Sequence, residues 1–206
     1  GKTQFGFSNQ LGISSAINRI KYLSGEQYTE LRNEFLKNTT SDPNFTPVAF
    51  NGVSTDWFEL LNRTGVYNKY NFNVSGSTSK FSYRTNVSYL KIDEPQMGNE
   101  TKQLNAGINL GFNSGRWDIN LMLNPSFVEK DAPNIFYGFA YLPTNAPYNA
   151  DGSFAGLGVS GQTRGNPLAA IAQNTNITKT YGLLGSLNLS YELNKAIKLS
   201  TLFGMD

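Results

Sequence analysis

The sequence of 206 residues contains neither cysteine nor histidine. Without cysteine, the chain can form no disulfide, no thiolate metal site and no cysteine nucleophile. Without histidine, it lacks the commonest general base and the commonest side-chain metal ligand. These absences argue against most hydrolases and metalloenzymes, and the sequence indicates no catalytic residue, no metal site and no cofactor.

Long apolar runs and concentrated charge are also missing. No stretch approaches the ~18 consecutive apolar residues that a membrane-spanning helix needs, and the mean hydropathy is −0.37. The net charge of +2 is spread along the chain, so no basic patch indicates nucleic acid or an anionic lipid surface. Residues 1–13 show no leader pattern, so an exported protein would need one upstream. A membrane β-barrel stays possible, because its strands span with only ~9–11 residues.

What the chain does contain is alternation of apolar and polar residues with a period of two, which is typical of strands. In the hairpin Tyr70–Tyr89, Phe72 and Val87 fall on one face, and Asn73 and Arg84 on the other. About seven such segments are expected. They are Thr3–Ile13, the two halves of Tyr70–Tyr89, Lys102–Phe112, Trp117–Phe127, Thr180–Tyr191 and a segment that starts near Ala196.

The connections between these segments alternate in length. Three are tight turns with the sequences GSTS, NSGR and LNKA, which suit hairpins. Two connections are about fifty residues long, and DEPQMGNE is intermediate. Short periplasmic turns and long extracellular loops are typical of outer-membrane barrels. The rhythm predicts an all-β, antiparallel transmembrane barrel segment, with 15–66 as the first extracellular loop and 128–179 as the third.

Two short helices are expected in the first long loop. Ser24 can cap a helix and Gln27 completes a capping box. The apolar stripe of this helix is expected to pack it, and consists of Tyr28, Leu31 and Phe35. A second helix is expected to start at Thr55 or Asp56, with Asp56 as its cap and Trp57 in a structural role.

The solvent of the apolar faces decides between two architectures. A soluble β-sandwich has the same alternation and stays an alternative on periodicity alone. Lipid is favoured because the apolar faces carry almost no charge and aromatic residues cluster near strand ends, as in a barrel girdle. The aromatic residues at these ends are Tyr70, Tyr89, Phe112, Trp117, Phe127, Tyr181 and Tyr191.

Several motifs together resemble the SusC/RagA family of TonB-linked outer-membrane proteins. They are EQYTELRNE (26–34), TDWFELLNRTGVYNKYNFNVSGSTSKFSYRTNVSYL (55–90), PYNADGSF (147–154) and NPLAAIAQNTN (166–176), followed by the last hairpin. The resemblance implies about seven strands from the N-terminal part of a plugged barrel of roughly 22 strands, located in the outer membrane of a Gram-negative bacterium. The plug is expected to lie outside this chain.

The same resemblance implies a nutrient importer that performs no covalent chemistry. It implies binding and translocation of glycan oligosaccharides or peptides, a SusD-like surface lipoprotein as lid, and a TonB complex contacted through missing N-terminal parts. Outer-membrane lipid is a further expected partner, and nucleic acid is not. The alternatives are a surface glycan-binding adhesin or lectin without transport, and an enzyme of glycan breakdown.

Candidate ligand-binding residues are aromatic side chains of the second long loop. Aromatic rings can stack on sugars, and the candidates are Phe136, Tyr137, Tyr141 and Tyr148. The alternative is that these rings pack the loop against itself, the plug or the lid. The glycine pattern at 156–161 lacks the strand and helix of a dinucleotide site. The acidic pairs Asp56/Glu59 and Asp93/Glu94 are better explained as solvated loop charges.

Overall fold

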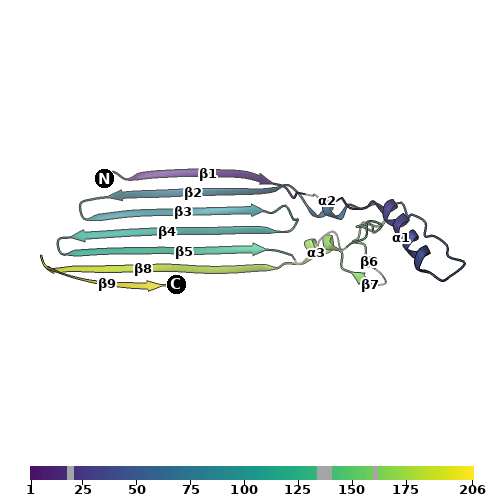
Figure 1. The fold of residues 1–206 in the computed structure, drawn as a ribbon. Coiled ribbons are helices and arrows are strands. Elements are labelled where there is room, and N and C mark those ends of the chain that lie inside the picture. Colours follow the sequence, from purple (N-terminus) through teal and green to yellow (C-terminus); the bar gives the residue numbers. More distant parts are fainter. Residues whose placement is uncertain (18–20, 134–140, 160–161) are drawn as a thin grey trace.

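A computed structural model describes residues 1–17, 21–133, 141–159 and 162–206. Its main feature is one antiparallel sheet in the order β1-β2-β3-β4-β5-β8-β9, so each strand lies beside its neighbour in sequence within the sheet (Figure 1). The strands are β1 (Gln4–Ser14), β2 (Gly65–Ser77), β3 (Phe81–Asp93), β4 (Glu100–Ser114), β5 (Trp117–Asp131), β8 (Ile177–Asn194) and β9 (Ile197–Met205). The predicted all-β class and the seven long strands are confirmed.

The strands are longer than the alternating patterns indicate. β5 continues to Asp131 and β8 begins at Ile177, because backbone pairing extends past the apolar pattern into charged and polar residues. The three short connections are tight turns, all at one end of the sheet (Figure 1). In the second of them, Gly115 has a φ of 59°, a conformation that favours glycine.

The pairing register places side chains of one kind on each face. Phe72 lies opposite Phe7 on one side and Val87 on the other, and Asn73 lies opposite Asn86 on the reverse face. A slip of one residue would exchange the two faces. The register therefore produces one apolar face and one polar face across all seven strands.

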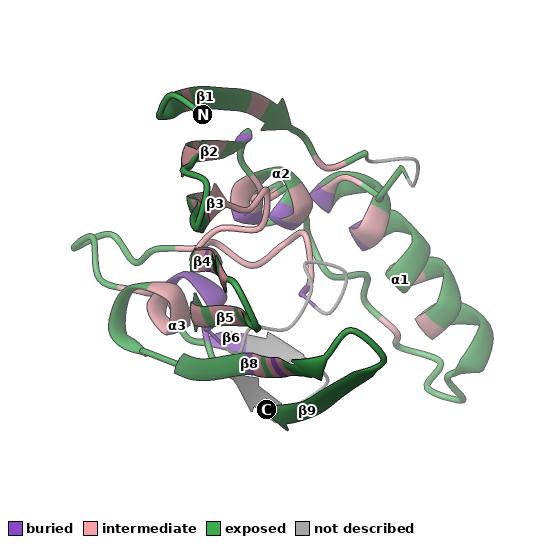
Figure 2. Ribbon diagram, turned by 90° about the vertical axis from the view of Figure 1, so that its left-hand side faces the viewer, coloured by how far each residue is buried: buried purple, intermediate pink, exposed green. Residues whose placement is uncertain are grey.

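The sheet is a single layer. Large apolar side chains stay exposed on its apolar face, including Phe5 at 71% and Tyr181 at 75%. The buried hydrophobic residues lie instead among the loops or at their helices, and Figure 2 shows the strands as a mostly exposed arc viewed end on. The β-sandwich alternative is therefore wrong, because no second sheet covers this face within the described residues. In that part of the chain, no helix is both long and apolar enough to cross a membrane.

A proline interrupts the middle of the sheet. Pro125 lies in β5 between two paired strands, where it has no N–H to donate. It still faces Leu183 of β8, but the pairing of β4 with β5 passes from Asn105–Ser126 to Ile108–Leu123 without a partner for Ala106 or Gly107. The ladder thus accommodates the proline by a local break rather than by ending the strand.

The helix α1 (Gly25–Thr39) begins as its sequence predicts. The Ser24 side chain accepts from the Gln27 backbone N–H, and the Gln27 side chain accepts from that of Ser24, which completes the capping box. The predicted packing of the helix is wrong, because Leu31 and Phe35 are 55% and 64% exposed. The reason is position: α1 lies beyond the loop end of the seven-stranded sheet, away from its strands (Figure 1).

The remaining elements lie between α1 and the sheet. They are α2 (Trp57–Leu61), β6 (Leu157–Val159), β7 (Gln162–Arg164) and α3 (Pro167–Gln173). Asp56 caps α2 through the Glu59 N–H, as expected. The β3–β4 connection joins α2, because Met97 N–H donates to Leu61 O at 3.0 Å. The loop end of the sheet is thus one packed region.

Candidate functional site

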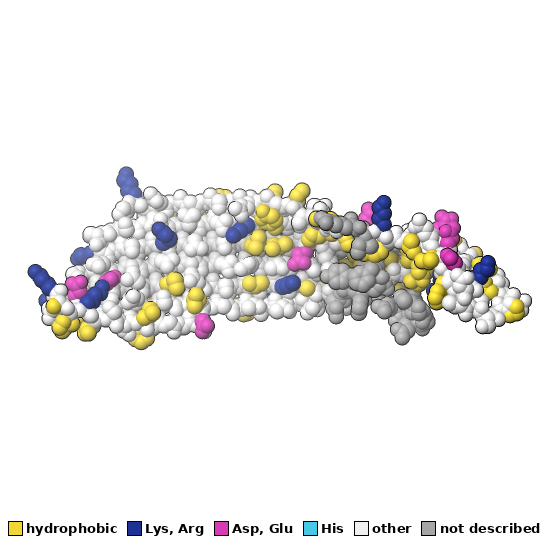
Figure 3. Space-filling model, viewed as in Figure 1, with side chains coloured by type: hydrophobic (Ala, Val, Ile, Leu, Met, Phe, Trp, Pro, Cys, Tyr) yellow, Lys and Arg dark blue, Asp and Glu magenta, His cyan; other side chains and the backbone are white. Residues whose placement is uncertain are grey.

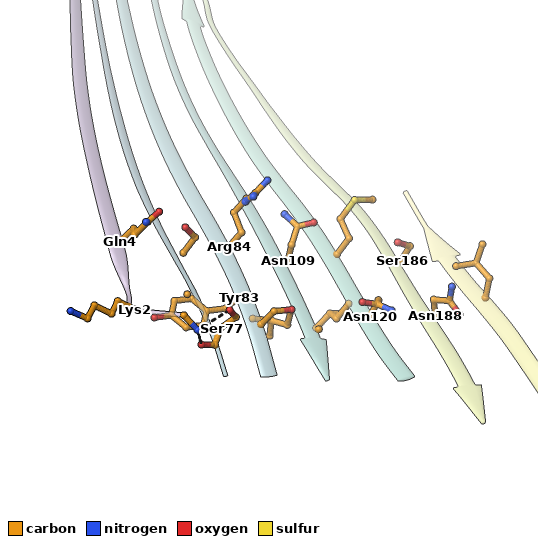
Figure 4. Close-up of a pocket in the computed structure, with 18 residues that line it drawn as sticks. Lys2, Gln4, Ser77, Tyr83, Arg84, Asn109, Asn120, Ser186 and Asn188 are labelled. Carbon is orange, nitrogen blue, oxygen red and sulfur yellow. Dashed lines mark hydrogen bonds between the residues drawn. The ribbon is translucent and has the colours of Figure 1, made fainter. Parts of the chain in front are cut away.

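The polar face of the sheet is hollowed near the short turns. The hollow, about 830 Å³, is lined by residues of all seven long strands. Most of the polar ones are small and uncharged, such as Asn109, Asn120, Ser186 and Asn188, and Figure 4 shows these side chains across adjacent strands. The sheet surface facing the viewer in Figure 3 is correspondingly mostly white, with scattered charged and hydrophobic side chains. This surface is suited to water and to polar ligands.

The charges on this polar face are mainly positive. Lys69 of β2, Arg84 of β3 and Lys130 of β5 belong to it by register. Lys198 of β9 is also on this face and pairs with Asp118 of β5 at 3.6 Å. Because these side chains are far apart along the strands, they form a weakly cationic wall rather than one anion site.

The two long loops are joined by a small hydrophobic core. The Trp57 ring lies 5.1 Å from the Tyr141 ring, and Leu157 completes the cluster with no exposed surface. Trp57 Nε1–H donates to Leu142 O at 3.0 Å. Thr55 adds two bonds, since its N–H donates to Pro143 O and its hydroxyl to Asn145 O, both at 2.8 Å. We call this group the loop clasp.

A second hollow, of about 300 Å³, lies beside the loop clasp. Its lining consists of Tyr22, Leu23, Ser24, Gln27, Ser54, Thr55, Asp56, Trp57, Phe58, Tyr141 and Pro143. Tyr22 stacks near Phe58 with ring centroids 6.4 Å apart. Rings beside hydroxyl, amide and carboxylate groups suit a small polar ligand with apolar faces. Several of the polar groups already cap α1 or α2, so aromatic contact is what this hollow chiefly offers.

The four aromatic candidates from the sequence are distributed differently. Phe136 and Tyr137 lie outside the described residues. Tyr141 is 7% exposed and packed on Trp57, so its ring chiefly holds the loop together and contributes only an edge to the second hollow. Tyr148 is 46% exposed and lies 5.6 Å from the Phe154 ring. The structure brings Tyr141 into the loop clasp and leaves Tyr148 on a separate turn.

That turn is organised by polar side chains. Asn149 N–H donates to Ser153 O at 2.8 Å, and Gly152 has a φ of 82°. Asp151 accepts from the Ser153 hydroxyl at 2.6 Å and from the Ser153 N–H at 2.9 Å. These bonds, the hydroxyl bond first, hold the pKa of the Asp151 carboxyl below its usual range. The turn therefore holds the Asp151 carboxylate through Ser153, while Tyr148 contacts Phe154.

Asn166 is a structural residue that the sequence analysis missed. Its Nδ2 donates to Pro147 O at 2.7 Å and to Ala155 O at 3.0 Å, and its Oδ1 accepts from Leu168 N–H. It thus caps α3 and ties this helix to the Tyr148 turn. The available signal was Asn166 directly before Pro167, since asparagine suits the cap and proline the first helical position.

Comparison with known proteins finds similarity to a curated relative and to several solved chains, among them two structures of one transporter. The chain is 28% identical over 159 residues to a TonB-dependent receptor, P26, of Formosa agariphila, which covers 74% of this chain and 16% of that protein. No protein-family model matches. The RagAB peptide transporter aligns with a TM-score of 0.75 at 15% identity, covering 98% of this chain and 28% of that chain. Its closed-closed state aligns with a TM-score of 0.68 at 13% identity, with the same coverage.

These similarities confirm the resemblance to SusC/RagA-type, TonB-linked outer-membrane proteins. The structural alignments show that the seven-stranded sheet has the fold of part of the RagA barrel. The chain spans about a sixth of the length of its curated relative and less than a third of the solved chains. The names of these proteins describe a TonB-dependent receptor and a peptide transporter.

The loop clasp generates a prediction about loop coupling. Trp57→Ala in the full-length protein should release the two long loops from each other, because large-to-small changes in cores cost ~3–5 kcal/mol and the bond to Leu142 O is lost. Limited proteolysis should cut near residues 51–56 and 141–145 at least tenfold faster. Tyr148→Ala, at an exposed position of the same loop, should leave these rates unchanged. Equal rates for Trp57→Ala and wild type would show that the clasp does not hold the loops.

Proposed function

We propose that this chain is part of the barrel wall of a TonB-dependent nutrient importer in the outer membrane of a Gram-negative bacterium. The observation that carries the proposal is the apolar face of the single-layer sheet. Between its aromatic rows, none of the side chains that this face carries in the seven described strands is charged. A wide exposed apolar surface suits lipid rather than water.

The height of this apolar face supports insertion in a bilayer. Tyr89, Phe127 and Tyr181 lie near the loop end of their strands, and Trp117 and Tyr191 near the turn end. Aromatic residues on one strand are eight to ten residues apart, which is roughly 27–34 Å of strand. With the usual tilt of ~35–45°, the band is roughly 20–27 Å tall, close to the ~25 Å expected of outer-membrane barrels.

The edges of the sheet support its membership in a larger barrel. β1 pairs only with β2, and β9 only with β8, among the described strands. Each therefore carries a row of backbone groups without a strand partner, and such groups are costly in hydrocarbon. Further strands of a barrel of roughly 22 strands would satisfy them.

The two ends of the strands are assigned to the two sides of the membrane. In the proposed orientation, the tight turns face the periplasm and the first and third extracellular loops are the connections 15–64 and 132–176, shorter than expected from the sequence because β2, β5 and β8 extend into them. The polar face lines the lumen and faces the plug and the cargo, which would be oligosaccharides or peptides. Cargo would bind at the loop mouth, a SusD-like lipoprotein would close over it, and the TonB complex would rearrange the plug. The segment would bind and guide, and perform no covalent chemistry.

Transport itself is tested in the host bacterium. Deletion of the full-length gene should abolish growth on at least one glycan or peptide mixture as sole carbon source. The intact gene should restore growth, but not in cells depleted of TonB, because uptake would need its energy. Surface binding of a glycan that persists without any TonB-dependent uptake would instead support the adhesin or lectin alternative.

The lipid-facing assignment is tested by one substitution on each face of β8. Leu187 lies about midway between Tyr181 and Tyr191 on the apolar face, and Asn188 beside it lines the polar hollow. Leu187→Arg should cost ~2–4 kcal/mol at the bilayer midplane and strongly reduce the fraction of full-length protein that migrates as a folded barrel in unheated gels. Asn188→Arg should fold normally. Equal folding of both variants would contradict the proposed solvent of each face.

The exposed face of α1 supports a contact with the lipoprotein lid. Leu31 and Phe35 are one helical turn apart, and the helix lies farthest from the sheet (Figure 1). Leu31→Ser with Phe35→Ser should reduce co-purification of the surface lipoprotein with the full-length barrel severalfold. The control is Glu30→Ser with Glu34→Ser, which has the same spacing on a neighbouring face and should keep the lipoprotein. If both double variants kept the lipoprotein, α1 would not belong to the lid-facing surface.

A further inference from the structure

A row of paired charges crosses the apolar face of the sheet at its loop end. It consists of Arg63, Asp93, Lys91, Glu100, Lys102, Glu129 and Lys179, and we call it the ion-pair row. Its shortest contacts are Lys102 Nζ to Glu100 Oε1 at 2.6 Å, Lys91 Nζ to Glu100 Oε2 at 2.9 Å and Lys179 Nζ to Glu129 Oε2 at 3.3 Å. Further pairs at 3.5–3.8 Å join the rest into one chain.

The ion-pair row starts where the apolar band ends. Tyr89, Leu104, Phe127 and Tyr181 lie opposite one another across four strands. Two residues farther along each strand, on the same face, Lys91, Lys102, Glu129 and Lys179 form the next such line. In a barrel this level is the interface between hydrocarbon and headgroups, so the row would meet headgroups.

The pairing makes this line of charges stable on a strand surface. Register sets Lys91 directly opposite Lys102, and Asp93 directly opposite Glu100, which are unfavourable like-charge pairs. Glu100 contacts both lysines, and Lys91 contacts both carboxylates, so each like-charge pair shares an opposite charge. The lysines are thereby held at fixed places on neighbouring strands.

The cations face outward more than the acids do. The side chains of Arg63, Lys91, Lys102 and Lys179 are 38–52% exposed, whereas those of Asp93, Glu100 and Glu129 are 24–32% exposed. Asp131 of β5 lies opposite Glu100 on the same face, so four carboxylates balance the four cations here, and the outward position of the cations rather than a net charge favours an anion. The surface thus presents ammonium and guanidinium groups above carboxylates that orient them.

We propose that the ion-pair row binds the phosphorylated sugar headgroup of a glycolipid in the outer leaflet. The inference rests on the proposed function, because it requires the apolar face to lie in that membrane. Ammonium and guanidinium groups bind phosphate by charge-assisted hydrogen bonds. From Lys91 on β3 to Lys179 on β8 the row spans three strand spacings, roughly 14 Å. A disaccharide headgroup with a phosphate at each end matches this span better than a phospholipid with one phosphate.

The test compares lipid retention by variants of the full-length protein. Wild-type protein is purified, exchanged into vesicles of phosphatidylcholine alone or with added lipid A or phosphatidylglycerol, and re-isolated for quantification of bound lipid. Lipid A should be enriched at the wild-type protein severalfold over phosphatidylglycerol. The outer triple variant Lys91→Gln, Lys102→Gln and Lys179→Gln should lose this enrichment.

Two controls keep the outcome interpretable. The inner triple variant Lys69→Gln, Arg84→Gln and Lys130→Gln removes the same charge from the polar face and should retain lipid A. Lys91→Arg with Lys102→Arg and Lys179→Arg should retain it too, which separates loss of charge from loss of folding. Equal retention by the outer and inner triple variants would overturn the inference, as would equal enrichment of phosphatidylglycerol. Failure of wild-type protein to insert into any vesicle would instead count against the proposed function.

Discussion

The structure depends on one constraint, the single-layer sheet. Its backbone hydrogen bonds run between neighbouring strands, so both faces stay uncovered and each must suit the solvent that it meets. Because successive side chains alternate between the faces, pairing register alone decides what each face presents. The register here gives a mainly apolar face from Phe5 in β1 to Phe203 in β9, with the ion-pair row at its loop end, and a reverse face dominated by Asn, Ser, Gln and Gly. No packed core is needed in the strands, and the buried hydrophobic residues accordingly lie among the loops and their helices.

The loop end obeys a different constraint. Two loops of about fifty residues would be costly to order separately, and here they share one small core around Trp57 and Leu157. Hydrogen bonds from Thr55 and Asn51 to the backbone at 143–145 add polar links between them. The loops consequently act as one body above the strands, from which α1 extends. Below them, α2 is bonded to the β3–β4 connection through Met97 N–H and Leu61 O.

The sequence predicted what depends on local pattern and missed what depends on distant contacts. Alternation located the strands, and cap residues located α1 and α2, because both signals act within a few residues. The strand ends near Asp131 and Ile177 were missed, since pairing there is maintained by the partner strand after apolar alternation stops. Leu31 and Phe35 were assigned to packing because an apolar stripe usually meets a core. Likewise, no local signal distinguished the buried Tyr141 from the exposed Tyr148, because only the fold brings Trp57 beside the former.

The charged residues show most clearly the difference between what local sequence predicts and what distant contacts determine. A net charge of +2 spread over 206 residues suggests an electrostatically plain protein, and the sequence analysis expected no anionic lipid surface on that basis. Strand pairing sorts those charges by face and height: Lys91, Lys102 and Lys179 gather at one level of the apolar face, while Lys69 and Arg84 are left on the polar face. Charges that are scattered in the sequence thus become one row of alternating cations and carboxylates in the sheet. In a β-barrel protein, the informative quantity is therefore the charge on one face at one height along the strands. The net charge of the sequence does not contain this information.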